Sequence, residues 1–194
     1  DYLGLVSKDP KVSRNAFQRL YDLILSCGTS EYEDVRKKLV HYKFFDDPFG
    51  NGDDAIFGLD LPLMRFVSVL RSAAEGYNTK KRVLLLHGPV GSSKSTIARL
   101  LKKGLENYSR TDSGALYTFN WEADIDGKHE KLDCPMHEEP LKLIPEELRS
   151  DVLARLSNEN FKIEVEGHLC PPCRFMYQKL SEQYDGKFSE ITKH

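Results

Sequence analysis

The sequence has no long apolar run and no excess of basic side chains. A membrane-spanning helix needs about 20 apolar residues, and the core of a signal peptide needs about 7 to 15. Against 30 Asp and Glu there are only 28 Lys and Arg, which excludes the basic balance typical of a nucleic-acid binder. We therefore expect a cytoplasmic protein with neither a membrane nor a nucleic acid as its partner.

Internal repeats and low-complexity tracts are also absent, and 40% of the residues are hydrophobic, which excludes a disordered segment. The length of 194 residues suits one to one and a half domains. Because the sequence begins at Asp1 without an initiator Met, we expect a fragment of a longer protein.

The most informative segment present is GPVGSSKST, residues 88–96, between an apolar run at 82–87 and a stretch of helical periodicity. It approaches the pattern G-x-x-x-x-G-K-[ST], in which backbone amides surround phosphates and the lysine neutralises the β and γ oxygens. Lys94 would be the catalytic lysine of this pattern, and Ser95 would bind Mg²⁺. Thr96 provides a second hydroxyl group. The residues expected to bind the nucleotide here are Gly88, Pro89, Val90, Gly91, Ser92, Ser93, Lys94, Ser95 and Thr96.

One position departs from that pattern, because Ser93 stands where the last glycine belongs. If the backbone there has a positive φ, a side chain costs roughly 1–2 kcal/mol. The alternative is a turn that merely joins a strand to a helix.

The periodicity predicts an α/β fold: a P-loop NTPase-like (AAA+) parallel sheet flanked by helices, truncated, with an N-terminal helical extension. We expect a helical segment over residues 1–60 and a partial nucleotide-binding domain over 61–194. The expected helices are 13–27, 31–43, 60–76, 97–108 (Lys102 and Lys103 on its wet side), 145–156 and 174–184; the expected strands are 83–87, 115–119 and 161–166; and the acidic loop 46–54 is expected to be solvated.

Two features of phosphoryl-transfer enzymes are missing after the loop. No apolar strand ends in paired acidic residues, and neither a His-Arg-Asp nor an Asp-Phe-Gly element occurs. Asp46 and Asp47 imitate the acidic pair but precede the loop. These residues are therefore expected to bind a nucleotide better than they turn it over.

Upstream, residues 55–59 resemble the element that contacts adenine in AAA+ ATPases. Phe57 and Gly58 would border the base. A plain turn into the following helix is the equally weighted alternative.

Three segments together, residues 86–96, 101–106 and 134–145, resemble the N-terminal AAA-type domain of the bacterial PrkA serine protein kinase family. The resemblance implies an ATP-binding domain of a kinase that transfers the ATP γ-phosphate to a protein Ser or Thr, with a link to stress responses. It also implies a missing C-terminal portion. The alternative is an AAA+ motor that assembles as a homo-oligomeric ring and couples ATP hydrolysis to protein remodelling or proteolysis.

Four residues have metal-ligand spacing: Cys134 and His137, and Cys170 and Cys173. Together they would form a tetrahedral zinc site. Buried thiols beside proline turns and a surface histidine are the alternative. A second hypothesis for this segment is that it faces the nucleotide through His137, Glu138 and Glu139. The simpler interpretation is an exposed acidic turn. A third functional hypothesis is an interaction domain that is stabilised by zinc and has lost nucleotide binding.

Overall fold

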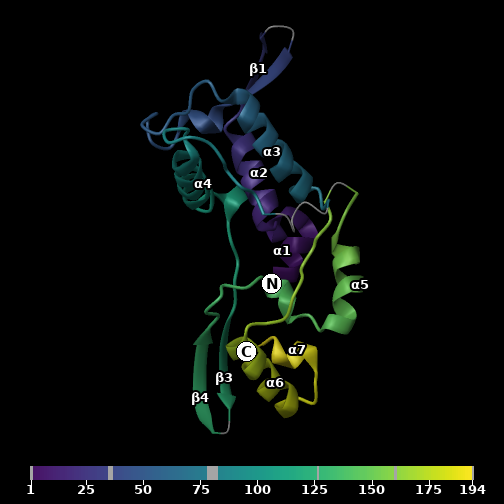
Figure 1. The fold of residues 1–194 in the computed structure, drawn as a ribbon. Coiled ribbons are helices and arrows are strands. Elements are labelled where there is room, and N and C mark those ends of the chain that lie inside the picture. The colour runs from purple at the N-terminus through teal and green to yellow at the C-terminus, as the bar shows by residue number, and fades with distance from the viewer. Residues whose placement is uncertain (1, 35–36, 78–82, 126, 160, 194) are drawn as a thin grey trace. The chain divides into compact units, whose positions relative to one another are not determined.

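The computed structural model describes residues 2–34, 37–77, 83–125, 127–159 and 161–193 (Figure 1). The chain divides into two compact units, one of residues 14–115 and one of residues 1–13 with 116–194. The domain boundary expected after residue 60 stays a prediction. The helices are α1 (Tyr2–Lys8), α2 (Ala16–Ser26), α3 (Asp60–Ala74), α4 (Lys94–Tyr108), α5 (Glu146–Leu156), α6 (Pro171–Gln183) and α7 (Phe188–Ile191), and the strands are β1 (Thr29–Asp34), β2 (Lys37–Tyr42), β3 (Asn120–Ile125) and β4 (Lys128–Asp133).

The unit of residues 14–115 is built on α2, α3 and α4, all of which the apolar periodicity predicted. Asn15 and Gln18 form a capping box at the start of α2, since each side chain binds the other's backbone amide. Gly104 permits close packing of α4, because a Cβ there would lie 2.6 Å from Phe44 Cε2 and 3.0 Å from Leu23 Cδ2. The core of this unit contains Leu23, Ile24, Phe44, Phe45, Ile56, Leu63, Val67, Leu70, Ile97, Leu100 and Tyr108.

The helix expected at 31–43 is wrong, because β1 and β2 pair there as an antiparallel hairpin; residues 35–36 lie outside the described residues. Contacts with α3 explain the difference. Tyr32 and His41 both bind Asp60 at the start of α3, and Leu39 is buried. These long-range contacts outweigh the local helical propensity of the charged residues.

The acidic loop was also predicted wrongly at one residue. Asp47 is fully buried and accepts hydrogen bonds from the Asp54 amide (3.1 Å) and the Lys103 ammonium (3.2 Å). Lys103 is thus engaged with the loop, which corrects its expected solvated position on α4. A Cβ on Gly50 would lie 1.9 Å from Lys103 Nζ and 2.1 Å from Asp47 Oδ2, so a side chain there would displace this ion pair.

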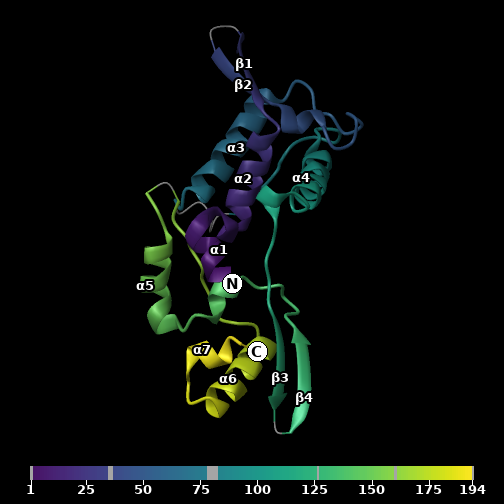
Figure 2. The ribbon, with the colours of Figure 1, turned by 180° about the vertical axis from the view of Figure 1, so that it is seen from behind.

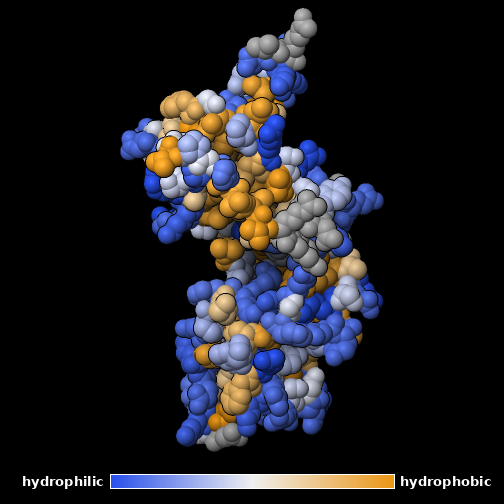
Figure 3. Space-filling model, in the orientation of Figure 1, coloured by the Kyte–Doolittle hydropathy of each residue, from blue (hydrophilic) through white to orange (hydrophobic). Residues whose placement is uncertain are grey.

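The apolar residues before the loop of residues 88–96 form no strand, contrary to the prediction of a strand over 83–87; Arg82 lies outside the described residues. Val83 is 94% exposed and Leu85 is 82% exposed. A buried parallel strand needs hydrogen-bonded neighbours, and the sheets in the described residues are two antiparallel pairs, β1–β2 and β3–β4. The expected parallel sheet is therefore not among the described residues. Figure 3 shows hydrophobic residues gathered on the surface of this unit.

In the unit of residues 1–13 and 116–194, the β3–β4 hairpin lies against α6 (Figure 2). Burial alternates along β3, so that Trp121, Ala123 and Ile125 face the core. The strand expected at 115–119 is displaced to 120–125. None of the helices in the described parts of the chain has the length and apolar character that crossing a membrane requires.

The helices α5 and α6 confirm two further predictions, although α6 begins three residues earlier than expected. Pro171 and Pro172 occupy its first turn, where a missing amide proton costs nothing. The strand expected at 161–166 is not formed. Ile163 is buried there, and its amide donates to Ser157 Oγ (2.9 Å) rather than to a neighbouring strand.

Candidate functional site

The Lys94 side chain folds back over the loop of residues 88–93. Its Nζ donates hydrogen bonds to Gly88 O (2.9 Å), Pro89 O (2.6 Å) and Ser92 Oγ (2.8 Å). The Ser92 hydroxyl in turn donates to Pro89 O (2.8 Å). The ammonium is thus held at the centre of a tight turn formed by residues 88–94.

The backbone of the loop has two left-handed residues. Ser93, which precedes α4, has φ 57° and ψ 15°, and Gly91 has φ 83°. Ser93 therefore has the positive φ that the sequence pattern raised as a possibility, at a cost of roughly 1–2 kcal/mol for its side chain. A Cβ on Gly91 would have no neighbour within 4 Å, whereas a Cβ on Gly88 would lie 2.7 Å from Ser92 Oγ.

The start of α4 adds backbone donors to the lysine. Ile97 N donates to Ser93 O (2.8 Å), so the amides of residues 93–96 precede the first intrahelical donor. The helix dipole places partial positive charge at this end. Val90 and Ser95 are exposed and Thr96 is half-buried. A polyphosphate requires a cation and several backbone amides close together. The residues present at this loop therefore suit the phosphates of a nucleoside triphosphate.

The segment expected to border adenine is exposed. Phe57 is 81% exposed, and Gly58 has φ 71° with open space where a Cβ would lie. Asp54, three residues upstream of Phe57, binds Arg99 of α4 at 2.8 Å. The ion pair anchors this segment to the helix that begins at Lys94, while the adenine role of Phe57 and Gly58 stays a prediction.

A histidine with two carboxylate partners lies in the same unit and was missed by sequence reasoning. His41 Nδ1 is 2.8 Å from Asp60 Oδ1, and its Nε2 is 3.0 Å from Asp46 Oδ1. Hydrogen bonds with Asp46 and Asp60 raise the pKa of His41, against the lowering effect of burial. No sequence spacing signals this group, since His41 lies in β2, Asp46 follows that strand and Asp60 begins α3.

Three cysteines and one glutamate meet in the other unit. The ligand atoms of Cys134, Glu138, Cys170 and Cys173 all lie within 4.8 Å of one another, and all four residues are buried. His137, the expected fourth ligand, is exposed. His137 has a left-handed backbone conformation, with φ 47°. The chain turns sharply there, so that Glu138 lies beside the cysteines, with its amide 3.4 Å from Cys134 Sγ. The structure thus brings the three cysteines together and leaves His137 outside the group, while their role as zinc ligands stays a prediction.

The Glu138 carboxylate is held in place from two sides. Its Oε2 accepts from the Cys170 amide and its Oε1 from Lys142 Nζ, both at 2.9 Å. Burial raises the pKa of the Glu138 carboxyl, but these two donors outweigh it and leave the pKa below its ordinary value. The expected exposed acidic turn is wrong for Glu138, and its carboxylate is engaged by the cysteine cluster.

An indole nitrogen also borders this cluster. Among the described residues, Trp121 Nε1 is buried without a hydrogen-bond partner. Burial raises the pKa of the Cys173 thiol to about 12, while the nearby Trp121 N–H acts in the opposite direction. The Trp121 N–H is thus a donor near Cys173 that forms no hydrogen bond among the described residues.

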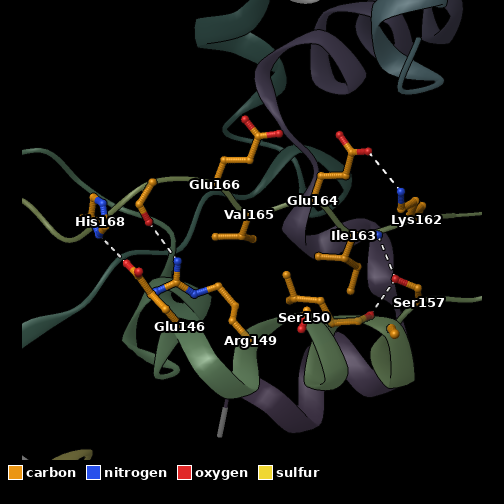
Figure 4. A pocket seen from close by; sticks show the side chains of 13 residues that line it. Glu146, Arg149, Ser150, Ser157, Lys162, Ile163, Glu164, Val165, Glu166 and His168 are labelled. Carbon is orange, nitrogen blue, oxygen red and sulfur yellow. Dashed lines mark hydrogen bonds and ion pairs between the residues drawn. The ribbon is translucent and has the colours of Figure 1, made fainter. Parts of the chain in front are cut away.

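A pocket of about 690 Å³ lies between α5 and residues 162–168 (Figure 4). Arg149 is the buried cation beside it, and its guanidinium donates to the carbonyls of Lys142, Ile144 and Gly167. The arginine thus holds these backbone segments together, and among the lining residues His168 Nδ1 is paired with Glu146 Oε1.

The model of the family described as PrkA AAA domain matches residues 1–193, so the chain belongs to this family of AAA domains, a class of ATP-binding domain. The chain is 37% identical over 192 residues to the ATP-dependent protease PrkA of Bacillus subtilis (strain 168), covering 98% of this chain and 26% of that protein.

Two shorter similarities accompany this match. The serine/threonine kinase YeaG of Escherichia coli (strain K12) is 41% identical over 49 residues, 25% of this chain and 8% of that protein. The Holliday junction branch migration complex subunit RuvB of Wolbachia sp. subsp. Brugia malayi (strain TRS) is 33% identical over 92 residues, 47% of this chain and 26% of that protein. No solved structure matches the chain. Nearly the whole of this chain aligns with the B. subtilis relative, but the chain spans only about a quarter of that protein's length.

Proposed function

We propose that residues 88–96 bind the triphosphate of ATP together with Mg²⁺. The observations that carry the proposal are the Lys94 ammonium held against the turn of residues 88–94 and the amides of residues 93–96, which precede the first intrahelical donor of α4. Lys94 neutralises the β and γ oxygens, the Ser95 hydroxyl contributes to Mg²⁺ binding, and the backbone amides hold the phosphates. Phe57 and Gly58 border the base.

We further propose that the protein uses this ATP to act on a protein substrate. A motor that couples hydrolysis to proteolysis or remodelling is the first candidate, supported by the name of the B. subtilis relative, which aligns with 98% of this chain. In an AAA+ ring, an arginine from the neighbouring subunit completes the site. Protein serine/threonine kinase activity is the second candidate, supported by the name of YeaG over 49 residues.

Either chemistry requires an acidic group beside the metal, and Asp47 does not supply it. Asp47 is fully buried and paired with Lys103. Turnover therefore depends on a carboxylate other than Asp47, and we propose that residues 88–96 are the binding part of the site.

The binding proposal is tested by calorimetry with Mg·ATP on the intact protein. Lys94→Ala should weaken binding by about 1.5–3 kcal/mol, which is a tenfold to more than hundredfold loss, because a charged hydrogen-bond donor is removed. Lys102→Ala is the matched control, since Lys102 lies exposed on the same helix. Unchanged affinity in Lys94→Ala would refute the role of the loop.

The two chemistries are separated by the fate of the γ-phosphate. The intact protein is incubated with γ-labelled ATP and a protein substrate. Release of free phosphate with substrate cleavage supports the motor, and stable label on a protein serine or threonine supports the kinase. Lys94→Ala should abolish whichever activity is seen.

A further inference from the structure

The cysteine cluster has the donor atoms, spacing and enclosure of a metal site. Cys134 follows β4, and Cys170 and Cys173 lie at the start of α6. In a tetrahedral site with Zn–S distances of about 2.3 Å, sulfur atoms lie about 3.8 Å apart. The ligand atoms here are all within 4.8 Å of one another, and Cys134 Sγ lies 3.9 Å from Glu138 Oε2. We propose that Cys134, Glu138, Cys170 and Cys173 bind a structural zinc ion, with Glu138 and not His137 as the fourth ligand.

The backbone orders two of the sulfur atoms in advance. Pro171 and Pro172 fill the gap between Cys170 and Cys173, and each proline ring fixes φ near −65°. The two cysteines occupy the cap and the third residue of a 13-residue helix, where the helix dipole favours negative charge. The Cys-Pro-Pro-Cys turn therefore holds the thiolates together at little entropic cost.

The fourth ligand is oriented by groups that do not contact the metal themselves. The Cys170 amide binds Glu138 Oε2, and the Lys142 ammonium binds Oε1. Such hydrogen bonds to a ligating carboxylate fix its direction and support metal affinity. Lys142 also offsets part of the negative charge of three thiolates and a carboxylate.

The surroundings favour a closed site. Trp121, Met176 and Leu180 are buried around the cysteines and keep water away. The Trp121 indole N–H has no other acceptor among the described residues, and a metal-bound sulfur is a strong one. Thiolate donors select zinc, copper(I) or iron–sulfur clusters over magnesium or calcium, and a single carboxylate with three thiolates suits tetrahedral zinc.

Metal analysis of the intact protein, purified under reducing conditions, is the first test. We expect one zinc per chain by mass spectrometry of the digested protein. Replacement by cobalt should give thiolate-to-cobalt charge-transfer bands and the visible bands of a tetrahedral ion. A metal-free protein whose three thiols all react freely, a disulfide among them, or an iron–sulfur spectrum would each overturn the proposal.

The donor set is tested with two neighbouring variants. Glu138→Gln should weaken zinc binding roughly tenfold or more, as measured by competition with a chelating indicator. His137→Ala, a change one residue away on an exposed side chain, should leave it unchanged. Loss of zinc in His137→Ala with retention in Glu138→Gln would overturn the assignment of Glu138.

A measurement on the unmodified protein avoids variants that fail to fold. Stepwise titration with an organomercurial should release zinc in proportion to the modification of the cluster thiols. Cys27→Ser removes a cysteine outside the cluster and should leave the released zinc unchanged. Thiol modification without zinc release would contradict the proposal.

Discussion

The loop of residues 88–96 and the cysteine cluster are built in opposite ways. The loop is open, with Val90 fully exposed and the apolar residues before it in solvent, and its geometry comes from backbone conformation and one lysine. The cysteine cluster is closed, with all four members buried beneath Trp121 and Leu180. The difference shows that one chain can hold polar groups ready either by local turn geometry or by packing around them.

The largest expected change in the free energy of unfolding comes from replacing one leucine beside the cysteine cluster, compared with one leucine before the loop. Leu180→Ala should lower the free energy of unfolding by about 2–5 kcal/mol, because the side chain is fully buried. Leu85→Ala should change it by less than about 0.5 kcal/mol, since Leu85 is 82% exposed. Denaturant titration of this chain followed by circular dichroism measures both. Equal losses would mean that residues 83–86 are packed in solution.

A smaller effect is expected from relieving the left-handed residue of the loop. Ser93→Gly should stabilise the chain by about 1 kcal/mol, because glycine adopts φ 57° without steric cost. Ser109→Gly is the matched control at the other end of α4, where φ is −64° and no gain is expected. Thermal unfolding measures both variants, and a loss of stability in Ser93→Gly would show that the serine is not strained.

The smallest effect concerns His41 and pH. Its partners Asp46 and Asp60 raise the pKa of His41 in the folded state, so they stabilise the protonated form. This stabilisation is fully present below the ordinary histidine pKa of about 6.5 and is lost as pH rises through the raised value. His41→Gln should therefore cost more stability near pH 6 than near pH 9, by less than about 1 kcal/mol.

The control for this prediction is His137→Gln, which removes one exposed histidine. Unfolding free energies are measured between pH 6 and pH 9. An equal cost of His41→Gln at both ends of the range would contradict the role of the two carboxylates.

The sequence predicted those features that depend on neighbouring residues. The helices α2, α3 and α4 follow from apolar periodicity, and the positive φ of Ser93 follows from the motif that it interrupts. The grouping of the three cysteines also follows from their spacing.

Features that depend on distant partners could not be predicted. Asp47 is buried because Lys103, 56 residues away, reaches it, and the β1–β2 hairpin depends on contacts with Asp60. Glu138 rather than His137 joins the cysteines because of one left-handed residue, which a C-x-x-H spacing does not reveal. The local sequence pattern thus predicted helices, whereas tertiary contacts decide which side chains are buried or brought together.

The fold of Lys94 onto Gly88, Pro89 and Ser92 has a consequence for ligand choice. These three oxygens are built-in competitors for the ammonium, and an incoming anion must replace them. A weakly charged group gains too little from that exchange, whereas a chain of several phosphates also recruits the amides that follow. If residues 88–96 bind ATP as we propose, the hydrogen bonds of Lys94 to these three oxygens favour ligands with several phosphates over ligands with one.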